Sequence, residues 1–331
     1  MEFLAHQLST SYTSVWDTLK TAKTVLEASN AVLLKFERPA DQSANVQNKR
    51  AAYGLEYYNK YHVTNTVVTP TVPTTQGGTT KMKYSASNKP LVCMQTQSTC
   101  YKGTSNMTVK GVLWHSTGAN NPNLKRYVQP SDIKPAADTY GKDEWLKLLG
   151  TNSYNNDWNH IERQAGLNCW IGKLADGTVT TVQTMPWNYK PWGCGSGSKG
   201  SCNNGWIQFE ICEDNLNDKT YFNKAYQEAC EITAYLCQMF DIDPHGIIEY
   251  NGVKVPTILC HADSHDLNLG SNHGDIYHWF IKYNKTMEDV RDDVAKLMGD
   301  NSDSKIEETI KPSAPEDSLY RVRTEWSNPS S

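Results

Sequence analysis

The stretch CHADSHDLNLGSNHGDIYHWF, residues 260–280, carries four of the chain's nine histidines and three aspartates. It follows the apolar run VPTILC, residues 255–260, which predicts a short buried strand that ends at Cys260. Ligands at a strand end and in the loop beyond it sit at the edge of a pocket, where a metal ion can keep an open coordination position. Imidazole nitrogen and carboxylate oxygen together suit zinc better than calcium or magnesium. A polar, solvated loop would explain any one of these side chains, but the cluster as a whole predicts a zinc site.

Two further polar residues end or interrupt apolar strand patterns elsewhere in the chain. His115 closes the run VKGVLWH (109–115), and a Ser-Thr-Gly turn follows it. Glu210 lies between Phe209 and Ile211 in the run WIQFEIC, whose apolar content predicts burial on both faces. Each residue alone would be an ordinary strand residue, but a buried carboxylate needs a partner or a raised pKa. Both conditions suit a general base beside a metal site.

The remaining strand and helix signals predict the fold class. Residues 168–173 and 178–183 flank Leu-Ala-Asp-Gly, and Asp-Gly between two such runs predicts a β-hairpin. Residues 221–240 and 286–298 show amphipathic helical patterns. Because strands alternate with helices, we expect an α/β fold in residues 91–300.

Composition separates this domain from three other parts of the chain. Residues 1–62 predict a small helical segment, because apolar residues recur at helical spacing from Val15 to Phe36 and a second helix covers residues 46–61. Residues 63–90 are rich in Thr, Pro, Ser and Gly and predict a flexible linker, with a hairpin as the alternative. Residues 301–331 are polar with prolines and predict a tail.

Four stretches stand in order along residues 91–300: GVLWHSTGA (111–119), NCWIGKLADGTV (168–179), GSGSKGSCNNGWIQFEICED (195–214) and ILCHADSHDLNLGSNHGDIYHWF (258–280). Together they resemble the motifs of the zinc-dependent N-acetylmuramoyl-L-alanine amidases of the type-2 family, whose fold phage endolysins and peptidoglycan recognition proteins share. The resemblance implies a central, mostly mixed β-sheet flanked by helices, a Zn²⁺ cofactor and bacterial peptidoglycan as the partner.

The resemblance also implies roles for individual residues. Two family zinc ligands, each a histidine that closes a core strand, fall on His115 and His261. The third ligand is contested between His273 and Asp275. Family sequences often read NH-x-D-P here, so we assign zinc to Asp275 and a catalytic role to His273. Two departures affect this assignment: Ile276 replaces the usual proline, and the 14 positions from His261 to Asp275 exceed the commoner spacing.

By the same resemblance, Glu210 matches the acidic residue of the family's IEICE-like strand. It would take a proton from water and later deliver one to the leaving amine, while His273 and zinc steady the oxyanion. The bond cut would join the lactyl carbonyl of N-acetylmuramic acid to L-alanine of the stem peptide. A WHCGSG phrase is usual upstream, but Gly193 stands where its histidine would be, so we assign no catalysis there. We expect His160 to be structural, and His265 and His278 to be supporting or surface residues.

The N-terminal segment contains the phrase FERPA (36–40), followed by Arg50 and by YYNK (57–60). This pattern resembles the C-terminal end of phage tail-lysozyme domains. It implies a phage origin but no glycosidase activity, because the lysozyme portion itself is not recognisable.

Charge and hydropathy exclude some classes of function. A net charge of −4 argues against a nucleic-acid binder that works by neutralising phosphates. No apolar run approaches the roughly 18 residues that a membrane-spanning helix needs. The N-terminus lacks the basic and apolar regions of a signal peptide. We therefore expect synthesis in a host cytoplasm and action on the cell wall, either after release or from a virion.

Two questions stay open at this point. Without a secretion signal we expect most of the nine cysteines to be reduced, although Cys93 with Cys100 and Cys194 with Cys202 could close small loops. Besides an endolysin, the chain could be a non-catalytic peptidoglycan-binding module, or a virion structural protein with a lytic domain. The expected full set of ligands favours the enzyme.

Overall fold

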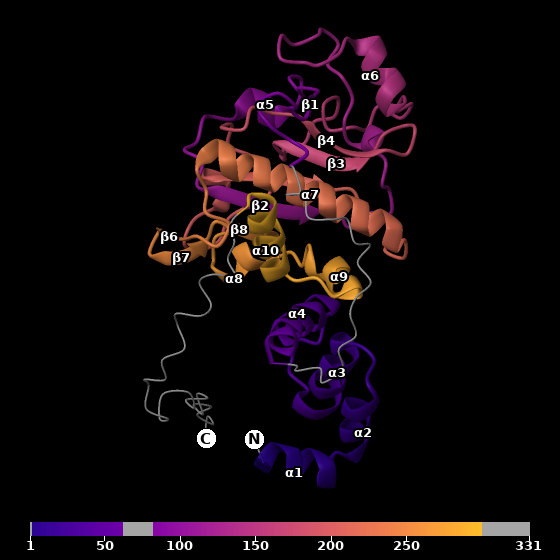
Figure 1. Cartoon of the computed structure of the whole chain (residues 1–331), viewed down its shortest axis with the longest axis vertical. Helices are drawn as coiled ribbons and strands as arrows, with labels where there is room; N and C mark the ends of the chain where they lie inside the picture. Colours follow the sequence, from indigo (N-terminus) through magenta and orange to yellow (C-terminus); the bar gives the residue numbers. More distant parts are fainter. Residues whose placement is uncertain (1, 62–81, 300–331) are drawn as a thin grey trace, which may run out of the picture.

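The computed structural model describes residues 2–61 and 82–299 (Figure 1). Most of the predicted linker and the whole predicted tail lie outside these residues. Residues 82–90, which we included in the linker, lie against the helix α7 (Lys219–Phe240), where Tyr84 is buried and its hydroxyl donates to Glu228. Within the described residues, no helix is long and apolar enough to cross a membrane.

A six-stranded sheet forms the centre of the region 91–299, with the order β1-β4-β3-β5-β2-β8. Its strands are β1 (Leu91–Val92), β2 (Gly111–Ser116), β3 (Cys169–Lys173), β4 (Val179–Gln183), β5 (Trp206–Ile211) and β8 (Ile258–Cys260). All neighbouring pairs are parallel except the β3–β4 hairpin. The α/β class, the mixed sheet and the hairpin are thereby confirmed.

The strand that precedes the His/Asp stretch is shorter than predicted. Val255 and Pro256 belong instead to β7 (Val253–Pro256), which pairs with β6 (Ile247–Tyr250) in a separate hairpin. Thr257 turns the chain between the two strands, and its hydroxyl donates to the carbonyls of Asp243 and Gly246. The strand still ends at Cys260, as predicted.

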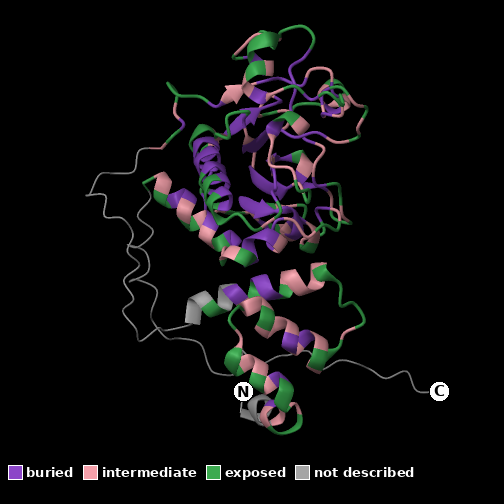
Figure 2. Ribbon diagram, turned by 90° about the vertical axis from the view of Figure 1, so that its right-hand side faces the viewer, coloured by how far each residue is buried: buried purple, intermediate pink, exposed green. Residues whose placement is uncertain are grey.

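One face of the sheet is covered by helices. Side chains alternate between the two faces of a strand, and Val112, Trp114, Ile207 and Phe209 point to the same apolar core as α7 and α10 (Met287–Leu297). Figure 1 shows α7 lying across the sheet, and Figure 2 shows buried residues concentrated in the strands and in α7. Truncating a fully buried aromatic such as Phe209 to alanine would cost about 3–5 kcal/mol.

The opposite face carries the polar residues found in the sequence. Strand alternation places His115 on this face with Leu113, and Glu210 with Gln208. Leu113 joins an apolar cluster with Trp206 near the amino ends of the strands, and Trp170 joins another over β3 and β4. His115 and Glu210 lie at the carboxyl ends of their parallel strands, where ligand sites in open α/β sheets commonly form.

The N-terminal segment contains α1 (Glu2–Ser11), α2 (Thr13–Thr21), α3 (Val25–Val32), a π-helical turn (Leu33–Glu37) and α4 (Ala44–Tyr61). The single apolar-periodic helix from Val15 to Phe36 was therefore wrong. Thr24 ends the periodicity because its hydroxyl accepts the Glu27 N–H at 3.1 Å and caps α3, while the Glu27 carboxylate accepts the Lys23 N–H. The spacing Thr24-x-x-Glu27 was a helix-start signal that the apolar pattern obscured.

Short helices complete the region 91–299: α5 (Thr99–Gly103), α6 (Lys142–Leu149), α8 (His261–Asp266), α9 (Tyr277–Phe280) and the 3-10 turns Leu124–Arg126, Cys202–Asn204 and Ile281–Tyr283. The nine cysteines all lie in described residues and all are buried free thiols, so neither of the two possible loop-closing disulfides is formed.

Candidate metal centre and active site

His115, His261 and Asp275 converge on one point. The Nδ1 atoms of the two histidines lie 3.1 Å apart, and the Asp275 carboxylate oxygens lie 3.0 Å from His115 Nδ1 and 3.4 Å from His261 Nδ1. Tetrahedral zinc with ligand bonds of 2.0–2.1 Å separates its ligand atoms by roughly 3.3 Å. The donor set and its spacing therefore fit a zinc ion held by three protein ligands.

The sheet register brings the two histidines together. Trp114 pairs with Cys260 across the parallel strands β2 and β8, so the next residue on each chain, His115 and His261, stand side by side. Their ring centroids are 4.8 Å apart, with the rings nearly perpendicular. Both side chains are buried. Two ligands thus follow directly from strand pairing.

The helix α8 explains the long spacing between His261 and Asp275. It begins at His261 and takes up the first residues of the intervening stretch, after which the chain turns back. The Ala262 N–H donates to the Asp275 carbonyl at 3.2 Å, and the Ser271 N–H donates to the Cys194 carbonyl at 2.8 Å. These backbone bonds return Asp275 to the start of the helix despite the extra residues.

The outward nitrogens of both histidines also have partners. His115 Nε2 lies 2.8 Å from Gln208 Oε1, and His261 Nε2 lies 3.2 Å from Ser271 Oγ. Metal-bound histidines commonly donate their second ring N–H to such acceptors, which orients the ring. We did not predict Gln208 or Ser271 from the sequence. Gln208 could have been found, because it lies two residues before Glu210 and so on the same face of β5.

Electrostatics favour the metal-binding forms of Asp275 and His261. Burial alone would raise the pKa of Asp275, but its close contacts with the His115 and His261 rings outweigh it and hold that pKa well below its usual range. Burial lowers the pKa of His261, against the opposing effect of Asp275. An ionised carboxylate and a neutral imidazole are the forms that bind a metal.

Glu210 lies beside this centre, directly opposite His115 in the β2–β5 register. Its Oε2 atom is shielded from solvent and has no hydrogen-bond partner among the described residues. Burial raises the pKa of Glu210 well above its usual value, and the nearby charges of Asp275 and Glu213 raise it further. A carboxylate in this state can accept a proton and later return it near neutral pH.

His273 lies at the rim of the centre. Its exposed ring stacks on that of His261 with centroids 4.6 Å apart, and its Nδ1 lies 3.2 Å from Ser271 Oγ. His273 is not part of the group of ligand atoms that could share an ion; Asp275 supplies the third member of that group.

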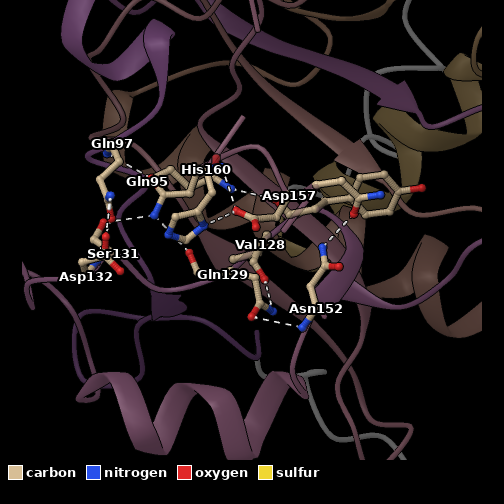
Figure 3. A network of polar contacts seen from close by, with 12 residues as sticks. Gln95, Gln97, Val128, Gln129, Ser131, Asp132, Asn152, Asp157 and His160 are labelled. Carbon is tan, nitrogen blue, oxygen red and sulfur yellow. Dashed lines mark hydrogen bonds and ion pairs between the residues drawn. The ribbon is translucent and has the colours of Figure 1, made fainter. Parts of the chain in front are cut away.

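The other histidines of interest have different surroundings. His278 is half-buried and bonds Glu213 Oε1 at 2.8 Å; Glu213 raises the pKa of His278 against the opposing effect of burial. His265 lies in the last turn of α8. His160 bonds the buried Asp157 at 2.8 Å within a polar network that includes Gln95 and Gln129, and Figure 3 shows this network. Its structural role agrees with our expectation.

The N-terminal segment touches the loop that carries Asp275. Asn45 Nδ2 of α4 donates to Asn272 Oδ1 at 3.0 Å, and Lys49 and Tyr53 both contact the Asp266 carboxylate. Ala52 of α4 belongs to the main apolar core. Figure 1 shows α4 beside α9, which follows the ligand loop. The helix α4 is therefore packed against the segment that carries Asp275.

Comparisons with known proteins give one family match and several similar solved structures. The profile of the N-acetylmuramoyl-L-alanine amidase family matches residues 105–276. Similar solved structures include the hydrolase AmiA of Staphylococcus aureus in complex with its ligand (15% identity, 79% of this chain and 93% of that chain, TM-score 0.37). They also include PlyL, with 14% identity over 61% of this chain and 93% of that chain and a TM-score of 0.36. The PlyG catalytic domain shows 16% identity over 67% of this chain and 99% of that chain, with a TM-score of 0.36. No curated protein sequence matches the chain.

Proposed function

The chain belongs to the N-acetylmuramoyl-L-alanine amidase family, and on that premise we propose that it hydrolyses peptidoglycan with a zinc ion held by His115, His261 and Asp275. The bond cut joins N-acetylmuramic acid to L-alanine of the stem peptide. The observation that carries the proposal is the convergence of two Nδ1 atoms and a carboxylate within 3.0–3.4 Å of one another.

Zinc, when bound here, supplies a Lewis acid that polarises the scissile carbonyl and makes water more acidic. His115, His261 and Asp275 would hold the ion, and three protein ligands are the usual number where zinc must also accept a water molecule or substrate. Asp275 is partly exposed, whereas His115 and His261 are buried, so a substrate would reach these residues from the side of Asp275.

Glu210 is proposed as the group that moves the proton. Its raised pKa allows it to take a proton from the attacking water and to hold that proton until the amine leaves. A free carboxylate in water would ionise too readily to serve as the acid in the second step. His273 would donate a ring N–H to the oxyanion, a contribution typically worth about 3 kcal/mol.

The presence of three candidate zinc ligands together with Glu210 favours a hydrolase over a module that only binds muropeptide. We further propose that the chain is a phage lysin, because residues 36–60 resemble the end of a phage tail-lysozyme domain. It would act on the wall either as a free protein after lysis or from the virion. Detection in purified particles would support the virion, and detection only in lysates would support the free enzyme.

Purified cell walls provide the direct test. The protein should release stem peptides with new L-alanine amino termini and leave the glycan strands intact, as identified by mass spectrometry. New reducing sugar ends, or cuts inside the peptide, would contradict the assigned bond. Wall binding without any release would instead indicate a binding module. Elemental analysis of the active protein should find one zinc per chain.

A further inference from the structure

A chain of hydrogen bonds runs from the loop at residues 193–203 through Gln208 of β5 to the His115 ring. It begins at Asn203, whose Oδ1 atom accepts the backbone N–H groups of Gly193 at 3.2 Å and Cys194 at 3.1 Å. Backbone N–H groups only donate, so the Asn203 atom that faces them is the carbonyl oxygen. This fixes the orientation of the Asn203 amide.

Gln208 must then point its amide in one direction. The Gln208 atom that lies 2.9 Å from Asn203 Oδ1 faces an acceptor, so it is the NH₂ group. The other end of the same amide, Oε1, is consequently the atom that lies 2.8 Å from His115 Nε2. Gln208 is fully buried, and Asn168 holds its backbone on both sides, accepting its N–H at 3.0 Å and donating to its carbonyl at 2.9 Å.

An amide oxygen can only accept, so His115 must carry a proton on Nε2. In a neutral imidazole the lone pair is then on Nδ1. Nδ1 is the atom that lies 3.1 Å from His261 Nδ1 and 3.0 Å from Asp275. The Gln208 amide therefore selects the tautomer of His115 whose lone pair points at the metal position.

We propose that Gln208 is a positioning residue that fixes the tautomer and ring orientation of His115 for metal binding, and that Gly193 provides the space for its amide. This inference rests on the proposed zinc function. A Cβ atom at position 193 would overlap Gln208 Oε1 and would lie 3.2 Å from His115 Nε2. The glycine that replaces the histidine of the usual WHCGSG phrase thus has a structural reason in this chain.

The first experiment uses the unmodified, zinc-loaded protein. Nitrogen-15 NMR of the histidine rings should show zinc on Nδ1 of His115 and a slowly exchanging proton on Nε2, because that proton is buried and bonded to Gln208. Zinc on Nε2, or a ring proton that exchanges rapidly with water, would overturn the proposal. This measurement needs no variant and so does not depend on the folding of one.

The second experiment measures zinc affinity by competition with a chromophoric chelator. Gln208→Met preserves the length of the side chain but removes the acceptor oxygen, and it should weaken zinc binding about 10–100-fold. Gln208→Glu retains an acceptor for His115 but loses the donor to Asn203 Oδ1, so its zinc affinity should lie between those of Gln208→Met and wild type. Gly193→Ala should weaken zinc binding to the same extent as Gln208→Met. The double variant should bind zinc no more weakly than either single variant, because all three break the same bond between Gln208 Oε1 and His115 Nε2.

Gly141→Ala is the matched control, since a Cβ there meets nothing closer than 3.8 Å and the residue has an ordinary φ of −71°. Unchanged zinc affinity in Gln208→Met would overturn the role of Gln208 while leaving the amidase intact. An unmodified protein that cleaves walls but contains no zinc would overturn both proposals. Loss of affinity in Gln208→Met and Gly193→Ala, with Gly141→Ala unaffected, would support the inference.

Discussion

Replacing Glu210 with glutamine should abolish catalysis and stabilise the fold at the same time. The side chain keeps its shape, but it can no longer accept the proton of the attacking water. Loss of a positioned general base typically lowers the rate about 10²–10⁴-fold. Stability should rise because the wild-type carboxylate is buried with one oxygen lacking any hydrogen-bond partner among the described residues, close to Asp275 and Glu213.

The pH dependence of this gain follows from the raised pKa of Glu210. The ordinary value is 4.5, and the folded protein holds the proton to a higher pH than the unfolded chain does. Between these two pKa values the folded state binds more protons, so the wild-type protein loses stability as pH rises through that window. Each unit of difference between the folded and unfolded pKa of Glu210 corresponds to about 1.4 kcal/mol of folding stability.

We expect metal-free Glu210→Gln to be more stable than wild type at pH 8, by about 1.4 kcal/mol for each unit by which folding raises the Glu210 pKa, and to gain nothing near pH 4.5. At about 2–4 °C per kcal/mol, the melting temperature should rise by several degrees. Bound zinc would favour the ionised carboxylate, so the gain should shrink in the zinc-loaded protein.

The assay compares thermal unfolding of chelator-treated proteins at both pH values, together with clearance of cell-wall suspensions by the zinc-loaded forms. Glu249→Gln is the matched control, because Glu249 is exposed on β6. It should change neither stability nor activity. Full wall clearance by Glu210→Gln would refute the catalytic role. A melting temperature at pH 8 equal to or below that of wild type would refute the argument from burial.

Three further outcomes follow from the contacts. His115→Ala should lose zinc, and added zinc should no longer raise its melting temperature, because metal binding to the folded state adds to folding stability; one retained equivalent of zinc would exclude His115 from the site. Asp266→Ala removes the acceptor shared by Lys49 and Tyr53, so stability should fall by at most about 1 kcal/mol while amide exchange in α4 accelerates; unchanged exchange would contradict the docking. Glu228→Gln should cost about 2 kcal/mol in chemical denaturation, because the carboxylate is buried and its Oε2 accepts from the Lys83 ammonium, toward which the glutamine NH₂ could only donate.

The sequence predicted those parts of the site that depend on strand patterns. His115 and His261 end apolar runs, and parallel pairing of β2 with β8 is sufficient to set them side by side. Glu210 interrupts a third run and comes to lie opposite His115 by the same register. The hairpin at Asp176-Gly177 followed from turn chemistry alone.

Other features depend on competition between local signals. The apolar spacing from Val15 to Phe36 predicted one helix, but the cap at Thr24 divides it into two. In the run 255–260 the chain changes partner at Thr257, so its first residues pair with β6 and its last with β2. Apolar content indicates that such residues are buried, but it does not reveal which strand they pair with.

The third ligand illustrates a further limit. His273 and Asp275 are two residues apart, and both are residue types that bind zinc, so composition and spacing leave them equivalent. The difference arises from the return of the chain after α8, where the Ala262 N–H bonds the Asp275 carbonyl and the His273 ring stacks outside His261. Neither contact leaves a periodic signal in the sequence.

Ring orientation depends on contacts that are still more dispersed. Gln208 directs the lone pair of His115, and Asn203 in turn orients the Gln208 amide. Two backbone N–H groups of the 193–194 segment fix the Asn203 side chain. A substitution in that loop can therefore change metal affinity without altering any ligand, because it changes which nitrogen of His115 is free to bind. Strand register accounts for the presence of the ligands at the centre, whereas their ability to bind an ion depends on this buried amide chain.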